Sequence, residues 1–272
     1  MTALRWIVFA VAVLTMNFPV ISTLITSFKS EAEIAGNPSW WIEAPTLANY
    51  EGIFAIADRF DILHYLWNSF ASSLLGAGMS LLLAFPAAYA MVRIGTGQKW
   101  LLPLVANLRA IPLIVFAIPL YLVYARVGLL DTKLGLALIL CIVNLPLVLV
   151  LLAAALRDLP AELDEAARVD GASTFGLLWR IVLPLATPAL ATTMVLGFVY
   201  AWNEFLFALM LTTRNAVTTT VGASFFFAAS GGGVRWGTAA AVMVLSVLPP
   251  MVLGLLLYRR IGQSLAAGAV KG

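Results

Sequence analysis

Long apolar stretches alternate with short polar ones along the whole chain. Six apolar stretches each hold about 20 residues or more, the length that a helix needs to cross a bilayer. They lie at roughly 6–28, 66–92, 101–125, 134–156, 185–211 and 238–258. A transmembrane β-barrel would show short segments of alternating polarity instead. The pattern predicts an all-α integral membrane protein, a single transmembrane domain over 1–272 with six membrane-spanning helices.

Composition supports the membrane class. Of the 272 residues, 62% are hydrophobic and 11% are charged, whereas about 25% of the residues in a soluble domain are charged. The net charge of +3 comes from basic residues scattered between apolar stretches. A nucleic-acid-binding surface would gather them in a patch, so the sequence indicates no nucleic-acid partner.

The distribution of basic residues predicts an orientation. Six spans place both termini on the same side of the membrane. If that side is the cytoplasm, the inside segments hold nine lysines and arginines and the outside segments hold six, which follows the positive-inside rule. We therefore expect cytoplasmic N- and C-termini and an external segment at 29–65.

A charged insert, residues 157–184, separates two of the most apolar stretches. Asp158 is a candidate N-cap for a helix that begins near Pro160. Gly171 suits a left-handed C-cap, and Ser173 or Thr174 can cap a second short helix. The first helix would carry one face made of Leu163, Ala166, Ala167 and Asp170. The second would carry an apolar face of Phe175, Leu178, Trp179 and Val182.

Two interpretations of the insert follow from these residues alone. The insert is either a helix pair that rests on the membrane surface or a docking element for another protein. The small residues Ala166 and Ala167 allow a close approach, which suits the second interpretation.

A motif in the insert resembles the EAA loop of ABC-importer permeases. It consists of Glu165-Ala166-Ala167, then Gly171 after three residues, and Ile181-x-Leu183-Pro184 after nine more. The resemblance extends over nearly the whole chain to the carbohydrate-type permeases of binding-protein-dependent transport systems, which are MalG-like and UgpE-like. The stretches that carry it include "PTLANY" (45–50), "AAYAMVR" (87–93), "GLLDTKLGL" (128–136), "AWNEFLFAL" (201–209) and "AAGAVKG" (266–272).

The resemblance implies the type I ABC-importer permease fold with a cytoplasmic coupling helix, in the inner or plasma membrane of a bacterium or archaeon. It implies three kinds of protein partner: a second, different permease, two ATPase subunits and an extracytoplasmic solute-binding protein. ATP and Mg would be bound by the ATPase subunits, and this chain would hold no cofactor, no metal and no catalytic residue. A sugar would be the solute, and membrane lipid would surround the spans.

The resemblance also assigns roles to particular residues. Coupling to the ATPase would involve the EAA-loop residues Glu165, Ala166, Ala167, Gly171, Ile181, Leu183 and Pro184. The C-terminal tail would add Gly268, Ala269, Val270, Lys271 and Gly272. The external loop at 212–237 would contact the binding protein through Phe225, Phe226, Phe227, Gly231, Gly232 and Gly233.

Polar residues inside apolar spans are candidates for the substrate pathway, because an ionisable group in the membrane is expected to face a cavity or a partner. The candidates are Asn203, Glu204, Tyr121 and Asn107. For Glu204 the alternative is a structural hydrogen-bonding anchor in the bundle, and for the others it is ordinary packing.

Two alternatives to sugar import stay open at this stage. One is a permease for another polar solute, and the other is a self-contained secondary transporter. None of the four lysines lies in a G-x-x-x-x-G-K-[ST] phosphate-binding loop, so the chain is not expected to be an enzyme that hydrolyses ATP.

Overall fold

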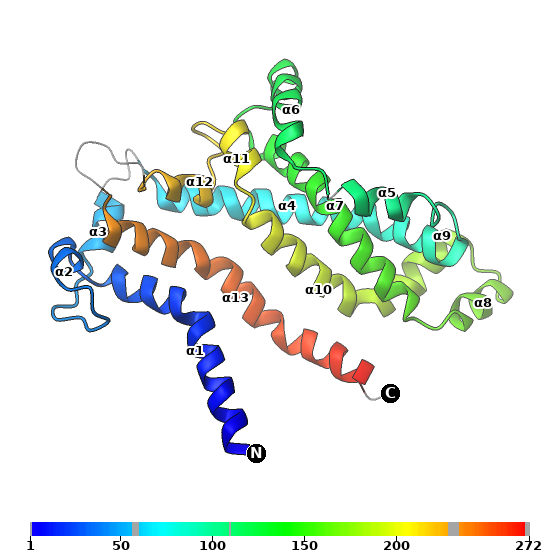
Figure 1. Ribbon diagram of the computed structural model, residues 1–272. Coiled ribbons are helices and arrows are strands. Elements are labelled where there is room, and N and C mark those ends of the chain that lie inside the picture. The colour runs from blue at the N-terminus through cyan, green and yellow to red at the C-terminus, as the bar shows by residue number, and fades with distance from the viewer. Residues whose placement is uncertain (1, 56–59, 109, 228–233, 270–272) are drawn as a thin grey trace. The chain divides into compact units, whose positions relative to one another are not determined.

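The computed structural model describes residues 2–55, 60–108, 110–227 and 234–269. In these ranges the chain forms helices joined by turns and loops, and no strand (Figure 1). Five of the described helical stretches are long and apolar enough to cross a membrane. They are Leu4–Ser27, Ile62–Ile94, Lys133–Arg157, Thr174–Trp202 and Trp236–Leu256, and Ile114–Val127 forms a shorter apolar helix. The predicted all-α membrane class is confirmed.

The chain divides into two compact units. The first comprises Met1–Leu66 and Thr219–Pro249, and the second comprises Trp67–Thr218 and Pro250–Gly272. Helices α4 (Ile62–Tyr89) and α13 (Trp236–Ala269) contribute residues to both units.

The first unit holds α1 (Thr2–Ser27), α2 (Glu31–Gly36), α3 (Ala48–Ala55), α12 (Thr219–Ser224) and the start of α13. A small apolar core forms where α3 and α13 meet the segment before α4, from Ile53, Phe60, Ile62, Ala241 and Val242. Buried Asn49 fixes the end of α1, because its Nδ2 donates to the carbonyls of Ser27 and Lys29 at 3.0 and 2.8 Å. The most apolar part of α1 has no buried residue. Lipid or a partner must therefore cover this part of the helix.

The second unit is built around α4, α7 (Lys133–Arg157) and α10 (Leu183–Trp202). Small residues allow these helices to approach closely, as is usual between helices in membranes. At Gly197 an added Cβ would lie 3.5 Å from Ala77 Cβ and 3.5 Å from Val148 Cγ2. The buried Asn144 side chain donates to the Gly197 carbonyl at 3.0 Å. Hydrogen bonding and close packing therefore hold α7 and α10 together.

The close approach of α4 and α7 at Gly76 gives a testable prediction. A Cβ at Gly76 would lie 2.7 Å from Leu140 Cβ and 3.0 Å from the Ala137 carbonyl oxygen. Gly76→Ala should therefore lower the free energy of unfolding by about 1 to 2 kcal/mol, a typical cost of overpacking. Gly78 on the same helix is the matched control, since its Cβ would meet only Met194 Cε at 4.0 Å. Thermal melting of both variants in detergent checks the prediction, and an equal effect at the two positions would contradict it.

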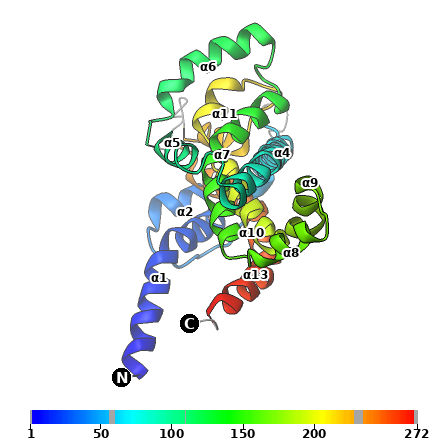
Figure 2. The same ribbon diagram turned by 90° about the vertical axis from the view of Figure 1, so that its right-hand side faces the viewer.

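Two of the ranges predicted as single helices are interrupted. The range 101–125 holds α5 (Leu101–Leu108) and α6 (Ile114–Val127). Pro112 lies between them, and a proline disfavours helical geometry in the residue before it. The range 185–211 holds α10, which ends at Trp202, and α11 (Leu206–Leu211). Each of these two ranges, which the sequence presents as one apolar span, therefore holds two helices. Helices α6 and α11 pack against each other in the second unit (Figures 1 and 2).

Candidate functional site

The charged insert folds as two short helices, α8 (Glu162–Val169) and α9 (Thr174–Leu177). Its first helix starts later than predicted. Asp158 follows the last residue of α7 as its C-cap, and Ala161 stands at the N-cap of α8 without a side-chain hydrogen bond. Three acids in the first turn and Arg168 in the last turn complement the helix dipole. These charges take the place of the side-chain cap.

Gly171 makes the bend between α8 and α9, as predicted. Its φ of +83° lies in the left-handed region, which glycine adopts far more readily than other residues. A Cβ at this position would meet nothing within 4 Å, so the backbone conformation and not space requires glycine. Ser173 then caps α9, because its Oγ accepts the Gly176 N–H at 3.2 Å.

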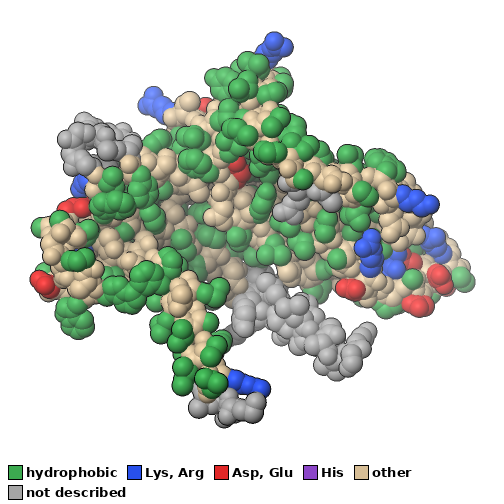
Figure 3. Space-filling model, viewed as in Figure 1, with side chains coloured by type: hydrophobic (Ala, Val, Ile, Leu, Met, Phe, Trp, Pro, Cys, Tyr) green, Lys and Arg blue, Asp and Glu red, His purple; other side chains and the backbone are tan. Residues whose placement is uncertain are grey.

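The two sides of α8 differ in burial. Asp164 and Ala167 face inward and are 7% and 8% exposed. Glu165 and Ala166 are exposed, and Val169 is 87% exposed. Of the predicted face, Leu163, Ala166 and Asp170 are exposed, whereas Ala167 belongs to the core of the second unit. Charged side chains gather over this end of the second unit (Figure 3).

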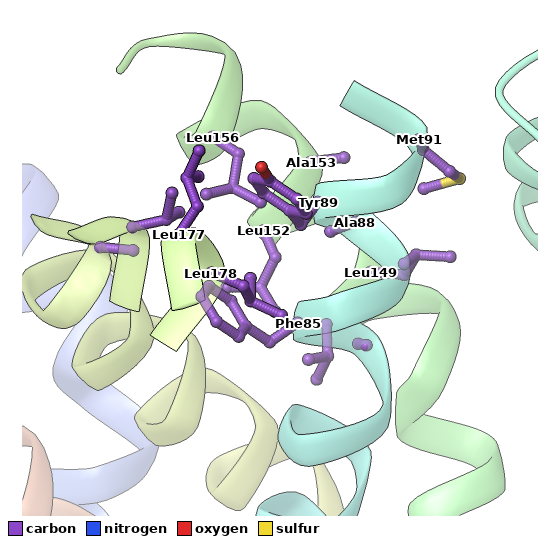
Figure 4. Close-up of a cluster of buried hydrophobic side chains, with 14 of the residues drawn as sticks. Phe85, Ala88, Tyr89, Met91, Leu149, Leu152, Ala153, Leu156, Leu177 and Leu178 are labelled. Atoms are coloured by element: carbon purple, nitrogen blue, oxygen red, sulfur yellow. The ribbon is translucent and has the colours of Figure 1, made fainter. Parts of the chain in front are cut away.

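The apolar face predicted for the second helix of the insert is shifted by tertiary packing. Leu177, Leu178 and Val182 are buried in the main cluster, while Phe175 is 72% exposed. Leu177 and Leu178 project into the cluster that also contains residues of α4 and α7 (Figure 4). From Leu178 to Val182 the chain forms a π-helix, η2, which leads into α10. Phe175 therefore adds to the exposed apolar surface of the insert.

The second half of the EAA motif lies on the inward side. Ile181 and Leu183 pack against the main cluster of the second unit. Pro184 is the second residue of α10 and follows directly on the π-helix η2. The motif residues are therefore divided between an exposed surface at Glu165 and Ala166 and a buried base that anchors the insert.

Two side chains from outside α8, Arg93 and Tyr89, hold its inner side and the segment that leads to it. Arg93 lies on η1 (Ala90–Ile94), the π-helix that continues α4. Its Nη2 donates to the Leu159 carbonyl at 2.7 Å, and its Nε lies 3.5 Å from Asp164 Oδ2. The Tyr89 hydroxyl donates to the same carboxylate oxygen at 3.4 Å. The sequence analysis did not find this network, although "AAYAMVR" was one of the stretches that carried the family resemblance.

The predicted pathway residues do not gather in one place. Glu204 starts α11: its carboxylate accepts the N–H groups of Phe207 and Ala208 at 2.9 and 3.1 Å. Asn203 is exposed, and its side chain donates to the Val199 carbonyl of its own helix. Asn107 likewise donates to the Pro103 carbonyl of α5, and Tyr121 is 41% exposed on α6. The contacts of Glu204 are those of a structural anchor.

A cavity of about 500 Å³ lies in the second unit at the break between α5 and α6. None of the four pathway candidates lines it. Its walls are mainly apolar, and the Tyr200 side chain is among them. The residues that line it are Leu108, Ala110, Ile111, Pro112, Leu113, Phe116, Leu120, Ile139, Ile142, Val143, Pro146, Tyr200 and Phe207.

The predicted binding-protein loop is described in part. Phe225 and Phe227 are 52% and 37% exposed. Phe226 packs edge-on against Phe60 in the core of the first unit, with ring centroids 4.4 Å apart. Gly231, Gly232 and Gly233 lie outside the described residues. In the predicted tail, Gly268 and Ala269 end α13, and Val270, Lys271 and Gly272 lie outside the described residues.

A carboxylate that the sequence analysis missed organises the segment after α11. Asp131, between α6 and α7, accepts the backbone N–H groups of four consecutive residues, 213–216, at 2.9 to 3.1 Å. Asn68 holds the opposite side of the segment through the carbonyls of Asn215 and Val217, both at 3.0 Å. Burial alone would raise the pKa of Asp131, but these N–H donors outweigh it and lower the pKa from 3.8 to about 2.

The fold and these sites define a class of protein. The chain is a multi-pass helical membrane protein that carries a charged two-helix insert beside its bundle, which is the architecture of a membrane transport subunit. Residues 76–267 match the family described as "Binding-protein-dependent transport system inner membrane component". The chain belongs to this family.

Curated relatives match over most of the chain. The sulfoquinovosyl glycerol transport system permease protein SmoH of Agrobacterium fabrum is 33% identical, covering 99% of this chain and 94% of that protein. The trehalose/maltose transport system permease protein MalG of Thermococcus litoralis is 34% identical, covering 94% of this chain and 91% of that protein. The trehalose transport system permease protein SugB of Mycobacterium tuberculosis is 35% identical, covering 84% of this chain and 82% of that protein.

Solved structures share the fold. A chain of a bacterial ABC transporter involved in the import of the acidic polysaccharide alginate has a TM-score of 0.77 at 20% identity, with 95% of each chain covered. The MetNI methionine ABC transporter has a TM-score of 0.60 at 16% identity, with 74% of this chain and 95% of the other covered. The predicted ABC-importer permease fold is confirmed.

Proposed function

We propose that this chain forms half of the translocation pathway of an ATP-driven importer for a sugar or sugar derivative. The names of three relatives support a carbohydrate as the solute, since those proteins are permeases for sulfoquinovosyl glycerol, trehalose and trehalose/maltose. All three solutes are polyhydroxylated. The resemblance of "AWNEFLFAL" and "AGAVKG" to the carbohydrate branch of the family agrees with this choice.

The exposed side of the insert carries the proposal of ATPase coupling. Val169 and Phe175 are the two most exposed large apolar residues on the insert, at 87% and 72%. An apolar surface bordered by charges is typical of a protein docking site. Glu165 and Ala166 lie on this surface, and Gly171 sets the angle between its two helices. An ATPase subunit is the partner that we propose for it, with ATP and Mg²⁺ bound by that subunit and no catalytic role for this chain.

The remaining partners follow from the same proposal. A second, different permease would complete the pathway, and two ATPase subunits would bind on the cytoplasmic side. The binding protein would meet this chain at Phe225 and Phe227 and at the glycines 231–233. The tail at 268–272 would reach the ATPase subunits. Asn203, Tyr121 and Asn107 remain proposed pathway residues, and for Glu204 the cap of α11 supports the structural role.

Purification of the tagged chain from its native membrane tests this function. We expect mass spectrometry to identify two copies of an ATPase subunit and one different permease in the complex. ATP hydrolysis should rise when the binding protein is added together with one member of a panel of mono- and disaccharides. Stimulation by amino acids alone would redirect the proposal to another polar solute. Ion-driven uptake by the purified chain without an ATPase would contradict it.

The proposed orientation gives a separate prediction. Ala44 and Gln98 are exposed residues in the segments expected outside and inside the membrane. In a Cys141→Ala background, Ala44→Cys should react with an impermeant maleimide added to intact spheroplasts, and Gln98→Cys should react only after lysis. Reaction of both cysteines in intact spheroplasts would contradict cytoplasmic termini.

A further inference from the structure

Arg93 joins the end of α4 to the chain around α8 at two points. Its Nη2 donates to the Leu159 carbonyl at 2.7 Å, just before α8, and lies 3.5 Å from the Pro160 carbonyl. Its Nε lies 3.5 Å from Asp164 Oδ2 on α8 itself. The Nε makes an ion pair with the carboxylate but no hydrogen bond. Both side chains of this pair are buried, at 10% and 9% exposure.

The backbone at the end of α4 suits this contact. The last turn is the π-helix η1, which carries Arg93 and ends at Gly95 with φ of +79°. A π-turn is wider than an α-turn and occurs frequently at functional sites. Tyr89, one turn earlier, adds its hydroxyl to the same carboxylate oxygen at 3.4 Å. Two side chains from one helix end therefore converge on Asp164.

Few other contacts hold α8. Of its eight residues, only Asp164 and Ala167 are buried. The opposite side of the helix is exposed, and its neighbour α9 is only four residues long. Arg168 of α8 also interacts with the Tyr89 side chain. The Arg93–Asp164 pair and the Tyr89 contacts therefore fix α8 to the end of α4.

A buried ion pair resists separation. Removing one partner leaves the other charge buried without compensation, which is strongly unfavourable. A force applied to the exposed side of α8 should therefore carry the end of α4 with it before the pair breaks. The pair would act as a fixed attachment between a surface helix and a membrane-spanning one.

We propose that Arg93 is a positioning residue that fastens α8 to α4, so that the two helices move as one body when an ATPase acts on α8. This inference rests on the proposed docking of α8 on an ATPase subunit. It adds a second route by which a displacement of the insert reaches a membrane-spanning helix. The first route is the direct chain connection through η2 into α10, and the second runs through Arg93 into α4.

Spin labels on the two helices test the attachment. Cysteines replace Leu83 on α4 and Glu162 on α8, both exposed, in a Cys141→Ala background of the full complex. Their separation is measured by double electron–electron resonance without nucleotide and after trapping with ATP and vanadate. We expect one narrow distribution that is the same in both states. In Arg93→Gln the distribution should broaden or shift in at least one state, while the ATPase subunits still co-purify.

Two further variants sharpen the result. Arg180→Gln removes an exposed arginine from η2, and we expect it to behave as the unmodified chain. Arg93→Lys keeps the charge but loses the guanidinium fork, so its distribution should be intermediate. If Arg93→Gln fails to assemble, Asp164→Asn replaces it with the same expectation, because Arg93 then keeps its bond to Leu159.

Two outcomes would overturn the inference. One is a separation in the unmodified complex that changes between the two states. The other is an unchanged narrow distribution in the assembled Arg93→Gln or Asp164→Asn complex. Failure of the proposed function itself would be visible earlier and separately, because the unmodified chain would then purify without an ATPase subunit.

Discussion

Gly171→Val should abolish the stimulation of ATP hydrolysis by the binding protein. The φ of +83° at Gly171 costs a residue with a side chain about 1 to 2 kcal/mol, and a β-branched residue tolerates this region poorly. The bend between α8 and α9 should therefore open, and the exposed surface formed by Ala166, Val169 and Phe175 should lose its shape. We expect stimulated hydrolysis to fall at least tenfold, measured in proteoliposomes, with membrane insertion intact.

Gly128→Val is the matched control for this prediction. Gly128 also has a positive φ, +71°, and a Cβ there would also meet nothing within 4 Å. It caps the C-terminus of α6, away from the insert in sequence and in fold. Backbone strain of the same kind should therefore leave the stimulated ATP hydrolysis in proteoliposomes unchanged. Gly171→Asn should retain much of the activity, because asparagine adopts the left-handed region more readily. Full stimulation in Gly171→Val would mean that the bend has no part in coupling.

Asp131→Asn should lower the free energy of unfolding of the second unit by about 1 kcal/mol at neutral pH. The shift of the Asp131 pKa from 3.8 to about 2 corresponds to about 2 kcal/mol at about 1.36 kcal/mol per unit, and solvent screening at this partly exposed carboxylate reduces that figure. The asparagine side chain keeps one acceptor oxygen, but its NH2 group replaces the other. This NH2 group would face the backbone N–H donors of residues 213–216 and cannot accept from them. We expect a lower melting temperature and faster cleavage by trypsin after Arg214, which is exposed in that segment.

The pH dependence of this effect has a definite sign. Because the folded-state pKa of Asp131 is depressed, its contribution is complete above about pH 4 and is lost as the pH falls through about 2. The difference between the unmodified chain and Asp131→Asn should shrink accordingly below pH 4. Asp61→Asn is a control, since Asp61 accepts the backbone N–H of His64 at 3.0 Å, and asparagine caps equally well. A constant difference down to pH 2 would contradict this explanation.

Trypsin cleavage after Arg126 provides an internal comparison in the same digest. Arg126 is exposed in the last turn of α6 and is not held by the Asp131 carboxylate. Its cleavage rate should change less than that at Arg214. Equal acceleration at both sites would indicate general unfolding and not the release of one segment.

Several features could be predicted from the sequence because their cause is local. Apolar runs of bilayer length predict membrane helices whatever surrounds them. Gly171 predicts a left-handed bend from its position after a helical stretch, and Ser173 predicts a cap from its position before one. The spacing of the EAA motif identified the family that the match over residues 76–267 established. Each of these properties depends on residues within a few positions of one another.

The errors of the sequence analysis came from competition between local signals and distant partners. Asp158 has the right residue type for an N-cap, but α7 extends as far as Arg157 and α8 begins at Glu162. Ala167 has the spacing of an exposed docking residue, but it is 8% exposed and belongs to the main cluster of the second unit. The range 185–211 is largely apolar, yet the Glu204 carboxylate within it starts a new helix.

The sequence by itself therefore determined the membrane class, the family and the positions of the insert and its bend. Only the tertiary structure decided which carboxylates anchor which elements. Asp131 meets its backbone donors 82 to 85 positions further along the chain, and Arg93 meets the Leu159 carbonyl 66 positions away. No periodicity relates residues at such separations. A buried carboxylate is stabilised by whichever donors the fold brings within about 3 Å, and that distance is set by the packing of the helices.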